Sequence, residues 1–461
     1  MKNVLLINPP WHKEKDNIWS GISSVNPPIG IASIASFLEG HAFKVAVLDM
    51  HALKMHARDP RGLPDIDRYA VIGITCTTPL IAAASEIVKI IRSIVPAHVK
   101  IILGGVHPTV APDECLMIDG VDYVVRGEGE LTFLEILQER DPENILGISR
   151  REDGRIVHNP ARPYITKLDD LPLPAYHLLP VHAYRPTLGA FKQLPGIGII
   201  TSRGCPGRCT FCYRLFGSSL QFRSADHVME EIRLLHKEYD IREIAFYDDT
   251  FTASKKRVIQ ICEMLLRENM GITWSCFART DFVDQEMLFM MKKAGCHQIM
   301  YGFESASEKI LQNINKRTDL HKVLEAIAWT KQAKIDIRAA FMLGSPGETE
   351  ETLEETYRFA VKIDPEIVIF NVTTPYPGTE MFEWAKKNNY LLTEDWKQYD
   401  LAHPVMDLPT ISHEKVKEAY NTMHRRFYIR PRYIFKQIKM ITSWLQIKTA
   451  LRTAFSVIVF K

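Results

Sequence analysis

Two kinds of apolar spacing alternate along the first 140 residues of the chain. Short apolar runs predict buried strands, and between them apolar residues recur at helical spacing, as in Pro79–Val95. This alternation indicates a parallel sheet with crossover helices. We therefore predict an α/β domain over residues 1–140, a doubly wound parallel sheet of flavodoxin-like topology. Its strands are expected at Val4–Ile7, Lys44–Leu48, Val71–Ile74, Lys100–Leu103 and Tyr123–Val125.

The rest of the chain divides by pattern into three segments. Residues 141–192 combine many Pro, Asp and Arg with weak periodicity, which predicts an extended linker. Strand and helix patterns alternate again over residues 193–400 and predict a second α/β domain. Residues 401–461 are expected to form a helical, basic extension.

Composition and charge narrow the function classes. The chain has 461 residues, enough for two or three domains, and its formal net charge of +2 gives no whole-molecule attraction to nucleic acid. No segment offers eighteen uncharged apolar residues, so a spanning helix is not predicted. The start of the chain does not resemble a secretory signal, and the eight cysteines are mostly far apart. We expect a cytoplasmic protein without disulfides.

The C-terminal end differs in charge from the rest of the chain. Residues 421–461 hold nine Lys or Arg and no Asp or Glu, which leaves the remainder with a charge of −7. Ile434, Ile438, Ile441 and Leu445 fall on one helical face, with Phe435 and Trp444 near its boundary and Lys436, Lys439 and Lys448 elsewhere. This pattern fits a helix packed on the protein body, which we favour, or a helix in peripheral contact with an anionic membrane.

Three cysteines form the tight cluster of the sequence. Cys205, Cys209 and Cys212 follow a predicted strand at Gly196–Thr201 with CxxxCxxC spacing, so their thiolates can surround one metal centre. Structural zinc usually has four ligands, and no fourth Cys or His lies nearby at a matching interval. Three thiolates on a [4Fe-4S] cluster would leave one iron open to substrate, which we favour over zinc. The other five cysteines are interpreted as small core residues.

At this loop the sequence resembles the radical S-adenosylmethionine superfamily, because the aromatic residue before the last cysteine is also present, as Phe211. The resemblance implies a partial (β/α)6 TIM-type barrel over residues 193–400 with a [4Fe-4S] cluster at its open mouth. S-adenosylmethionine would bind the open iron, with Phe211 against its adenine and Tyr213 nearby. An electron from the cluster would then cleave it to methionine and a 5′-deoxyadenosyl radical.

Further S-adenosylmethionine ligands are expected at the ends of later barrel strands. Much of the superfamily carries Gly-Gly-Glu after the second strand, whereas this chain has Asp248-Asp249, whose carboxylates either accept hydrogen bonds from the methionyl ammonium or cap a helix. Glu304 is similar to the family's residue near the ribose. Arg279 and Arg338 are the remaining candidates and would face the carboxylate.

Loops at the carboxyl ends of the first sheet's strands are rich in Gly, Pro, Thr and Asn. Ligands of such sheets bind at those ends, where glycine lets a large flat ligand approach the backbone, although each loop alone is also explained as a tight turn. One branch of the superfamily has a cobalamin-binding domain with similar loops ahead of the barrel. By that resemblance the cobalamin-binding residues are Asn8, Pro9, Pro10, Thr77, Thr78, Gly104, Gly105, His107, Thr109, Gly127 and Glu128.

The cobalt ligand of cobalamin mutases is not expected here. Those enzymes carry DxHxxG, whereas this chain has Trp11-His12-Lys13 after its first strand. The resemblance implies a lower cobalt face without a protein histidine. His12, His51 and His107 are interpreted as polar loop residues rather than ligands.

Two enzymatic functions and one non-enzymatic function remain open. The first is a methyltransferase in which methylcobalamin and the 5′-deoxyadenosyl radical together methylate an unactivated carbon. The second is radical cyclisation or ring contraction of a tetrapyrrole-like or hopanoid-like substrate, and the third is a cobalamin-sensing or redox-sensing protein. We favour the first, with a small-molecule or lipid-like substrate and an electron donor such as flavodoxin or ferredoxin.

Overall fold

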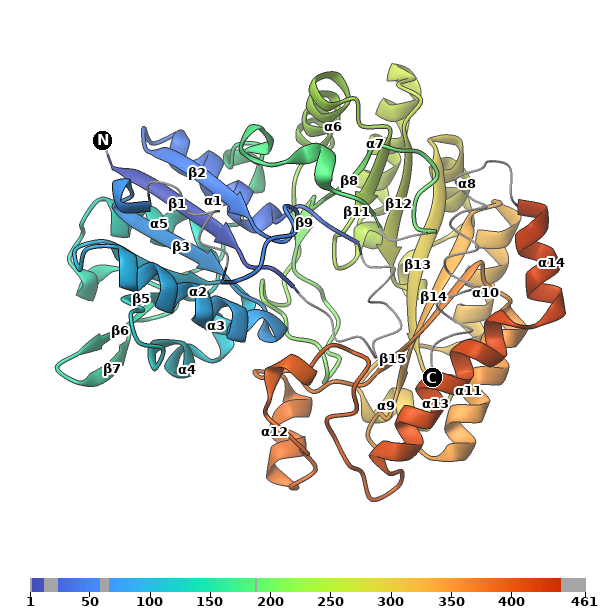
Figure 1. The fold of residues 1–461 in the computed structure, drawn as a ribbon. Coiled ribbons are helices and arrows are strands. Elements are labelled where there is room, and N and C mark those ends of the chain that lie inside the picture. The colour runs from blue at the N-terminus through green and yellow to red at the C-terminus, as the bar shows by residue number, and fades with distance from the viewer. Residues whose placement is uncertain (1, 12–23, 59–65, 187–188, 441–461) are drawn as a thin grey trace.

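The structure is a computed structural model that describes residues 2–11, 24–58, 66–186 and 189–440, without the side chains of 438–440. Two sheets lie side by side, the N-terminal one at the left of Figure 1 and the C-terminal one at the right. Both are built mainly from parallel strands. The α/β class predicted from the apolar spacing is therefore confirmed.

The N-terminal sheet has seven strands in the order β2-β1-β3-β4-β5-β6-β7. Its first five strands are parallel, and their order is that of flavodoxin-like sheets, as predicted. The elements are β1 (Asn3–Asn8), α1 (Ile29–Glu39), β2 (Lys44–Asp49), β3 (Val71–Thr75), α2 (Ile81–Ile94), β4 (Lys100–Gly104), α3 (Val106–Val110), α4 (Pro112–Leu116), β5 (Tyr123–Val125), α5 (Glu130–Leu137), β6 (Ile148–Glu152) and β7 (Arg155–His158).

Alternate residues of the first strand enter different cores. Leu5 and Ile7 pack with α2 on one face, whereas Val4 and Leu6 pack with α1 and α5 on the other. A strand buried on both faces needs a continuous apolar run, which explains the sequence of β1. The carboxyl ends of the parallel strands point toward the second domain (Figure 1).

The predicted linker is not wholly extended. β6 and β7 form an antiparallel hairpin that continues the N-terminal sheet beyond β5. Charged residues, including Arg150, Arg151 and Glu152 of β6, interrupt the apolar pattern by which strands were predicted. Residues 159–186 and 189–195 contain short 3-10 turns but no strand among the described residues.

The second sheet has six parallel strands in chain order, from β8 to β15, and it forms the predicted partial barrel. Among the described residues its edge strands β8 and β15 do not pair with each other, so the barrel is open on one side. The elements of this domain are β8 (Gly196–Ile199), β9 (Ser202–Arg203), β10 (Gln221–Phe222), α6 (Ala225–Tyr239), β11 (Glu243–Phe246), α7 (Lys255–Glu268), β12 (Thr273–Ala278), α8 (Gln285–Lys293), β13 (Cys296–Glu304), α9 (Glu308–Asn313), α10 (Leu320–Gln332), β14 (Asp336–Leu343), α11 (Glu350–Ile363), β15 (Ile367–Val372) and α12 (Glu380–Lys387).

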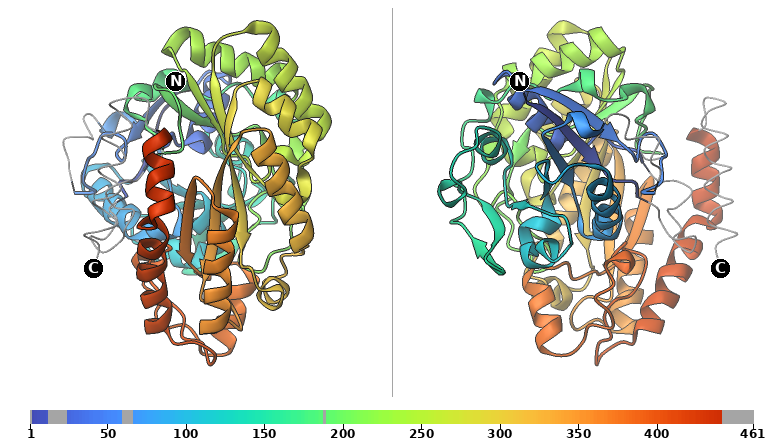
Figure 2. Two further views of the ribbon diagram at one scale, coloured as in Figure 1. Left: turned by 90° about the vertical axis from the view of Figure 1, so that its right-hand side faces the viewer. Right: turned by 60° about the vertical axis from the view of Figure 1, so that its left-hand side comes forward.

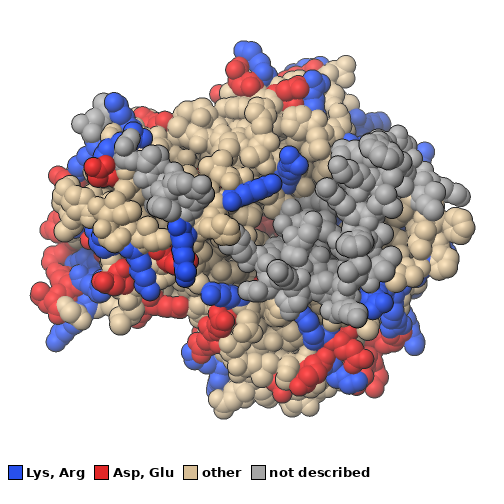
Figure 3. All heavy atoms as spheres, viewed as in Figure 1, with Lys and Arg blue, Asp and Glu red and all other residues tan. Residues whose placement is uncertain are grey.

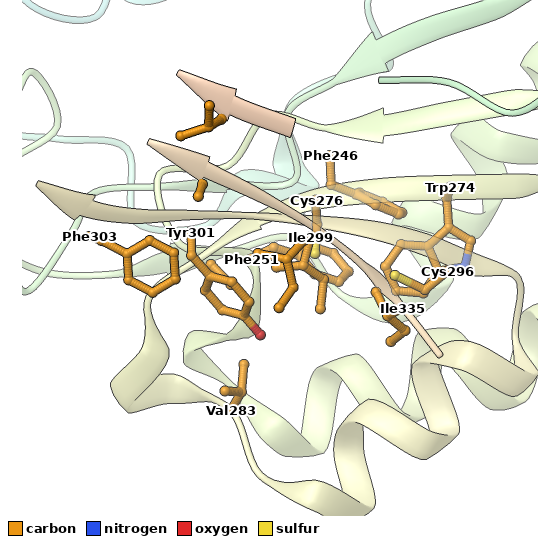
Figure 4. Close-up of a cluster of buried hydrophobic side chains, with 14 of the residues drawn as sticks. Phe246, Phe251, Trp274, Cys276, Val283, Cys296, Ile299, Tyr301, Phe303 and Ile335 are labelled. Atoms are coloured by element: carbon orange, nitrogen blue, oxygen red, sulfur yellow. The ribbon is translucent and has the colours of Figure 1, made fainter. Parts of the chain in front are cut away.

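The outer face of the barrel sheet is buried against its helices. Figure 4 shows part of this core, in which the rings of Phe246 and Phe251 stack with their centroids 4.3 Å apart. The fully buried Trp274 donates its indole N–H to the carbonyl of Ala294 at 2.8 Å. Because successive strand residues point to opposite faces, this packing also fixes which residues point into the barrel.

The C-terminal extension begins with two helices along the free edge of β15. They are α13 (His413–Tyr428) and α14 (Pro431–Met440), and Figure 2 shows them on one side of the barrel. His424 accepts a hydrogen bond from the N–H of Phe370, and the Tyr428 hydroxyl bonds to both the N–H and the carbonyl of Val368. Side chains of α13 thereby satisfy backbone groups of the edge strand.

The predicted tail helix lies partly within α14. Ile434 and Phe435 are exposed there, whereas Tyr433 is buried and Lys436 forms an ion pair with Glu366. The side chains of Ile438 and Lys439, and Ile441, Trp444, Leu445 and Lys448, lie outside the described residues, as does His12.

Candidate functional site

The three predicted cluster ligands lie on one loop at the barrel mouth. The loop is held at its base by the antiparallel pairing of β9 with β10. Two backbone hydrogen bonds anchor its middle, from Thr210 N–H to the carbonyl of Ile314 and from Met381 N–H to the carbonyl of Thr210. Cys205 and Cys209 are half-buried and Cys212 is exposed, so one side of the loop faces the site.

The chemistry of the three cysteine side chains suits an iron-sulfur cluster. All three are free thiols on one loop. Cysteine thiolates are the protein ligands of such clusters.

Charged side chains gather around the cysteine loop. Arg279 and Lys316 act against the effect of burial, which raises the pKa of the Cys209 thiol. Burial, with Asp249 acting in the same direction, raises the pKa of Cys212 to about 12. Cations beside the thiols favour their thiolate forms and hence an anionic metal cluster. The structure thus brings Asp249 and Arg279 to the predicted mouth.

Glu304 reaches the same mouth from an unusual backbone conformation. It ends β13 with a φ of +65°, where the register between β13 and β14 shifts. Its carboxylate pairs with Lys316 at 2.6 Å, and Lys316 also donates to the carbonyl of Gly302 at 2.6 Å. A left-handed glutamate costs on the order of 1–3 kcal/mol, so the bulge is maintained by this pairing and its surroundings.

The two adjacent aspartates are in different environments. Asp248 is fully buried and accepts hydrogen bonds from Thr201 N–H at 2.5 Å, Thr201 Oγ1 at 2.6 Å and Ser202 Oγ at 2.7 Å. Asp249 is exposed. Both oxygens of Asp248 are committed to the strand that leads into the cysteine loop, so the geometry leaves Asp249 to contact a ligand.

The predicted cobalamin residues divide into accessible and buried groups. Asn8, Thr77, Gly104, Gly105, Thr109 and Gly127 retain accessible surface at the edge of the first sheet, whereas Pro9, Pro10, Thr78, His107 and Glu128 are buried beneath it. Thr109 Oγ1 accepts from Gly127 N–H at 3.0 Å and donates to the Gly105 carbonyl at 2.7 Å. This side chain holds two of the loops together.

His107 presents no surface to a ligand. It is fully buried, its Nδ1 lies 3.3 Å from Thr78 Oγ1, and its ring packs against Trp396 with centroids 5.6 Å apart. Trp396 in turn donates to Glu114 at 2.6 Å. The side chain therefore joins the first domain to the segment after α12, which agrees with its interpretation as a non-ligand.

The two predicted sites adjoin each other. A Cβ atom on Gly378 would lie 2.6 Å from Val110 of α3 and 3.2 Å from Tyr213 of the cysteine loop, so these three residues meet. Beside them Arg203 forms a buried ion pair with Glu128 and a second with Glu130 at 2.6 Å. The edge of the first sheet is thus fixed directly to the base of the cysteine loop.

Two residues at this junction were not predicted from the sequence. Lys316 lies in the loop after α9, and nothing in its local sequence marks it as a partner of Glu304. Arg203 stands two residues before Cys205 and pairs with carboxylates more than 70 residues away. The proximity of Arg203 to the cysteine loop was its one available signal.

Family comparisons agree with this arrangement. The model described as "Radical SAM superfamily" matches residues 199–360, and the "B12 binding domain" model matches residues 21–137. An uncharacterized methyltransferase of Pyrococcus horikoshii is 36% identical over 94% of each chain. The anaerobic magnesium-protoporphyrin IX monomethyl ester cyclase of Rubrivivax gelatinosus is 27% identical over 94% of this chain and 78% of its own.

Solved structures share the fold. The cobalamin-dependent S-adenosylmethionine radical enzyme OxsB, solved with aqua-cobalamin and S-adenosylmethionine bound, superimposes with a TM-score of 0.75 at 19% identity. The superposition covers all of this chain and 72% of OxsB. Both domains therefore occur together, in this arrangement, in an experimental structure.

Proposed function

We propose, from the premise that this chain belongs to the radical S-adenosylmethionine superfamily and carries a B12 binding domain, that it methylates an unactivated carbon of a small molecule. Its cofactors are S-adenosylmethionine, a [4Fe-4S] cluster and cobalamin. When bound, the cluster supplies the electron that cleaves S-adenosylmethionine, and cobalamin supplies the methyl group. Relatives named as methyltransferases support this choice.

The residues at the barrel mouth fit the first two cofactors. Cys205, Cys209 and Cys212 would hold the cluster, since they are free thiols on one anchored loop. Phe211, Tyr213, Asp249, Arg279 and Glu304 would surround S-adenosylmethionine, because all of them retain accessible surface beside that loop. Asp248 would act as a positioning residue that holds the strand before the cysteines.

The edge of the first sheet fits cobalamin. Gly104, Gly105 and Gly127 would let the corrin approach the backbone, while Thr77 and Thr109 offer hydroxyl groups next to them. Asn8 donates to Asp49 at 2.9 Å and, with the buried Pro9, Pro10, Thr78 and Glu128, would support these loops from beneath.

The meeting of Val110, Gly378 and Tyr213 is the observation that carries the proposal. A methyl group moves from cobalamin to a substrate radical only if both cofactors open onto one space. The contact joins the cobalamin edge to the cluster loop and so supports that requirement. The buried ion pairs of Arg203 hold the edge of the first sheet against the base of the cysteine loop.

Product analysis tests the proposal. The protein is reconstituted without oxygen with iron, sulfide and hydroxocobalamin, reduced, and given S-adenosylmethionine with candidate substrates. Formation of S-adenosylhomocysteine together with 5′-deoxyadenosine, and a gain of 14 mass units in the substrate, is expected, since one methyl replaces one hydrogen. Cys209→Ala should form neither product, whereas Cys262→Ala, a change in the buried core, should retain both. Absence of both products from the parent protein would contradict the proposal and favour a sensing role.

Radical cyclisation is the second candidate. The Rubrivivax gelatinosus cyclase matches this chain over 94% of its length, which is as much as the Pyrococcus horikoshii methyltransferase covers. A cyclase would form 5′-deoxyadenosine without S-adenosylhomocysteine. The ratio of the two products therefore separates the candidates.

The tail and the electron donor complete the proposal. No described helix is long and apolar enough to cross a membrane. A donor such as flavodoxin or ferredoxin would supply electrons in a cytoplasmic setting. Exposed Ile434 and Phe435 support peripheral contact of the tail with a membrane. A chain ending at Met440 that also carries Ile434→Ser and Phe435→Ser keeps the buried Tyr433 and should lose binding to anionic liposomes without losing S-adenosylmethionine cleavage. Unchanged liposome binding would exclude this role for the tail.

A further inference from the structure

Arg338 lies on the inner face of the barrel without a partner for its charge. On β14 its neighbours Ile337 and Ala339 are fully buried in the core beneath the helices, so the alternating strand points Arg338 the other way. Its Nε atom is buried and has no hydrogen-bond partner. Among the described residues the guanidinium forms no ion pair, although buried charges in proteins are normally paired.

The side chains on the inner face around Arg338 remain partly accessible. The strand register places Arg338 level with Met300 and Ile367, and Met300 level with Phe277. The ring of Tyr247 packs against Phe277 with centroids 5.2 Å apart. All five residues retain accessible surface, whereas the residues beside them on the outer face are fully buried. The inner face therefore offers an apolar, partly aromatic surface with one cation.

No carboxylate in the described ranges forms an ion pair with Arg338. Burial lowers the pKa of Arg338, and the hydroxyls of Tyr247 and Tyr428 are the groups that act in the opposite direction. Tyr247 itself donates to Asn26 Oδ1 at 3.2 Å, and Tyr428 is bonded to Val368. The nearest carboxylate along the same strand face, Asp336, makes no ion pair with Arg338 among the described contacts. An anion from outside the chain would complete the site.

The depth of Arg338 separates it from the S-adenosylmethionine site. Glu304 at the mouth is in register with Phe341, three residues further along β14, so Arg338 lies about 10 Å deeper in the barrel. Arg279, Lys316 and Glu304 all act on the pKa of the Cys209 thiol, which places them at the cysteine loop. A carboxylate held at the cysteine loop would therefore be met by Arg279 rather than Arg338.

We propose that Arg338 binds a carboxylate or phosphate group of the substrate, whose apolar part lies against Tyr247, Phe277 and Met300. The inference rests on the proposed function and restricts its substrate to organic anions. It also differs from the sequence-based prediction that Arg338 faces the carboxylate of S-adenosylmethionine. A guanidinium can bind either anion through two parallel hydrogen bonds.

Binding of small fluorinated probes tests the assignment. Fluorine NMR of 4-fluorobenzoate and 4-fluorobenzamide, which differ in charge but little in shape, is recorded with the oxidised holoenzyme. We expect the acid and not the amide to bind the parent protein, about tenfold more weakly in Arg338→Gln and to an intermediate degree in Arg338→Lys. Arg358→Gln, a change at an exposed arginine, should leave binding unchanged. Saturating S-adenosylmethionine should not displace the acid.

Several outcomes would overturn the assignment. These are equal binding of acid and amide, no binding of the acid by the parent, unchanged binding by Arg338→Gln, or displacement of the acid by S-adenosylmethionine. S-adenosylmethionine cleavage without substrate is measured on reduced samples of the parent protein and of Arg358→Gln, which should cleave within about twofold of each other. A failure of cleavage in all samples would count against the proposed function, whereas the probe binding reports on Arg338 independently.

Discussion

Two sheet edges meet in this molecule, the edge at the carboxyl ends of the N-terminal strands and the mouth of the barrel. Their residues differ in chemical type. The edge of the first sheet presents Gly104, Gly105 and Gly127 with neutral hydroxyl groups between them. The barrel mouth presents charged side chains, among them Arg279, Glu304 and Lys316. The first edge suits a large flat ligand held by backbone contacts, and the second suits a charged ligand at a metal cluster. Mutations should therefore have their effect through backbone conformation at the edge of the first sheet and through side-chain charge at the barrel mouth.

Away from the contact between the two sheets, the surface does not show this separation of neutral and charged side chains. Figure 3 shows acidic and basic side chains interspersed over the N-terminal domain on the face viewed. On this face of the N-terminal domain acidic and basic side chains are therefore not segregated, in contrast to the site.

The largest effect is expected from the cysteine loop. Cys205→Ala, Cys209→Ala or Cys212→Ala should each abolish cluster assembly and S-adenosylmethionine cleavage, because a cluster cannot be held by the two thiolates that remain. Cobalamin binding should persist, since its loops lie on the other sheet. Iron content and EPR measure the first effect, and the absorption of bound hydroxocobalamin measures the second. A joint loss of both cofactors would show that the two edges are not independent.

The ion pairs that join the edges should come next. Arg203→Met leaves the carboxylates of Glu128 and Glu130, each about 4% exposed, without their cation, and should lower the free energy of unfolding by about 3–5 kcal/mol. The matched control is the triple variant Arg203→Met, Glu128→Gln, Glu130→Gln, which should recover most of the loss. Denaturant unfolding of the apoprotein measures both.

Glu348 provides a test by pH on the barrel side. It follows β14, and burial raises its pKa to about 7, against the bonds it accepts from Thr352 Oγ1 and Ser345 N–H. The unfolded state loses this proton first, at about pH 4.5, so stability should fall as pH rises from about 4.5 to 7, by up to about 3 kcal/mol. Glu348→Gln should remove this slope in urea unfolding between pH 4.5 and 8. Glu351→Gln, at an exposed neighbour, should keep it.

Substitutions of two glycines at the edge of the first sheet should have the smallest effects on stability. They compare backbone strain with close approach of neighbouring atoms. A Cβ on Gly105 would lie 2.8 Å from the carbonyl oxygen of Cys76, whereas one on Gly127 would meet nothing within 4 Å. Both have positive φ, so Gly127→Ala should cost about 1 kcal/mol and Gly105→Ala about 2–3 kcal/mol. Thermal unfolding of the apoprotein checks the difference. Equal losses would mean that backbone strain, not close approach, dominates at this edge.

Local patterns predicted the parts of the fold that local residues determine. The apolar spacing predicted the parallel strands and the doubly wound order, the cysteine spacing predicted one metal-binding loop, and the family resemblance implied its place at a barrel mouth. The hairpin of β6 and β7 was missed because its charged residues lack the apolar pattern of buried strands.

Contacts between distant segments could not be read from the sequence. Asp248 resembled a ligand residue beside Asp249, yet its carboxylate is used by Thr201 and Ser202, 46 or 47 residues away. The pairing of Arg203 with Glu128 spans 75 residues. The first contact depends on how strand ends meet within the barrel and the second on how the two domains dock, and no local window of the sequence encodes either.

The hydrogen bonds that side chains of α13 make to the outer edge of β15 affect whether the barrel can close. His424 donates from Nδ1 to the carbonyl of Tyr420, and burial lowers its pKa to about 4, so Nε2 stays unprotonated and remains an acceptor for Phe370 at neutral pH. The backbone N–H groups on the outer edge of β15 already have hydrogen-bond partners. β15 can therefore pair neither with β8 nor with a strand of another molecule. The barrel sheet therefore stays open between β8 and β15, and the side chains of α13 occupy the outer edge of β15.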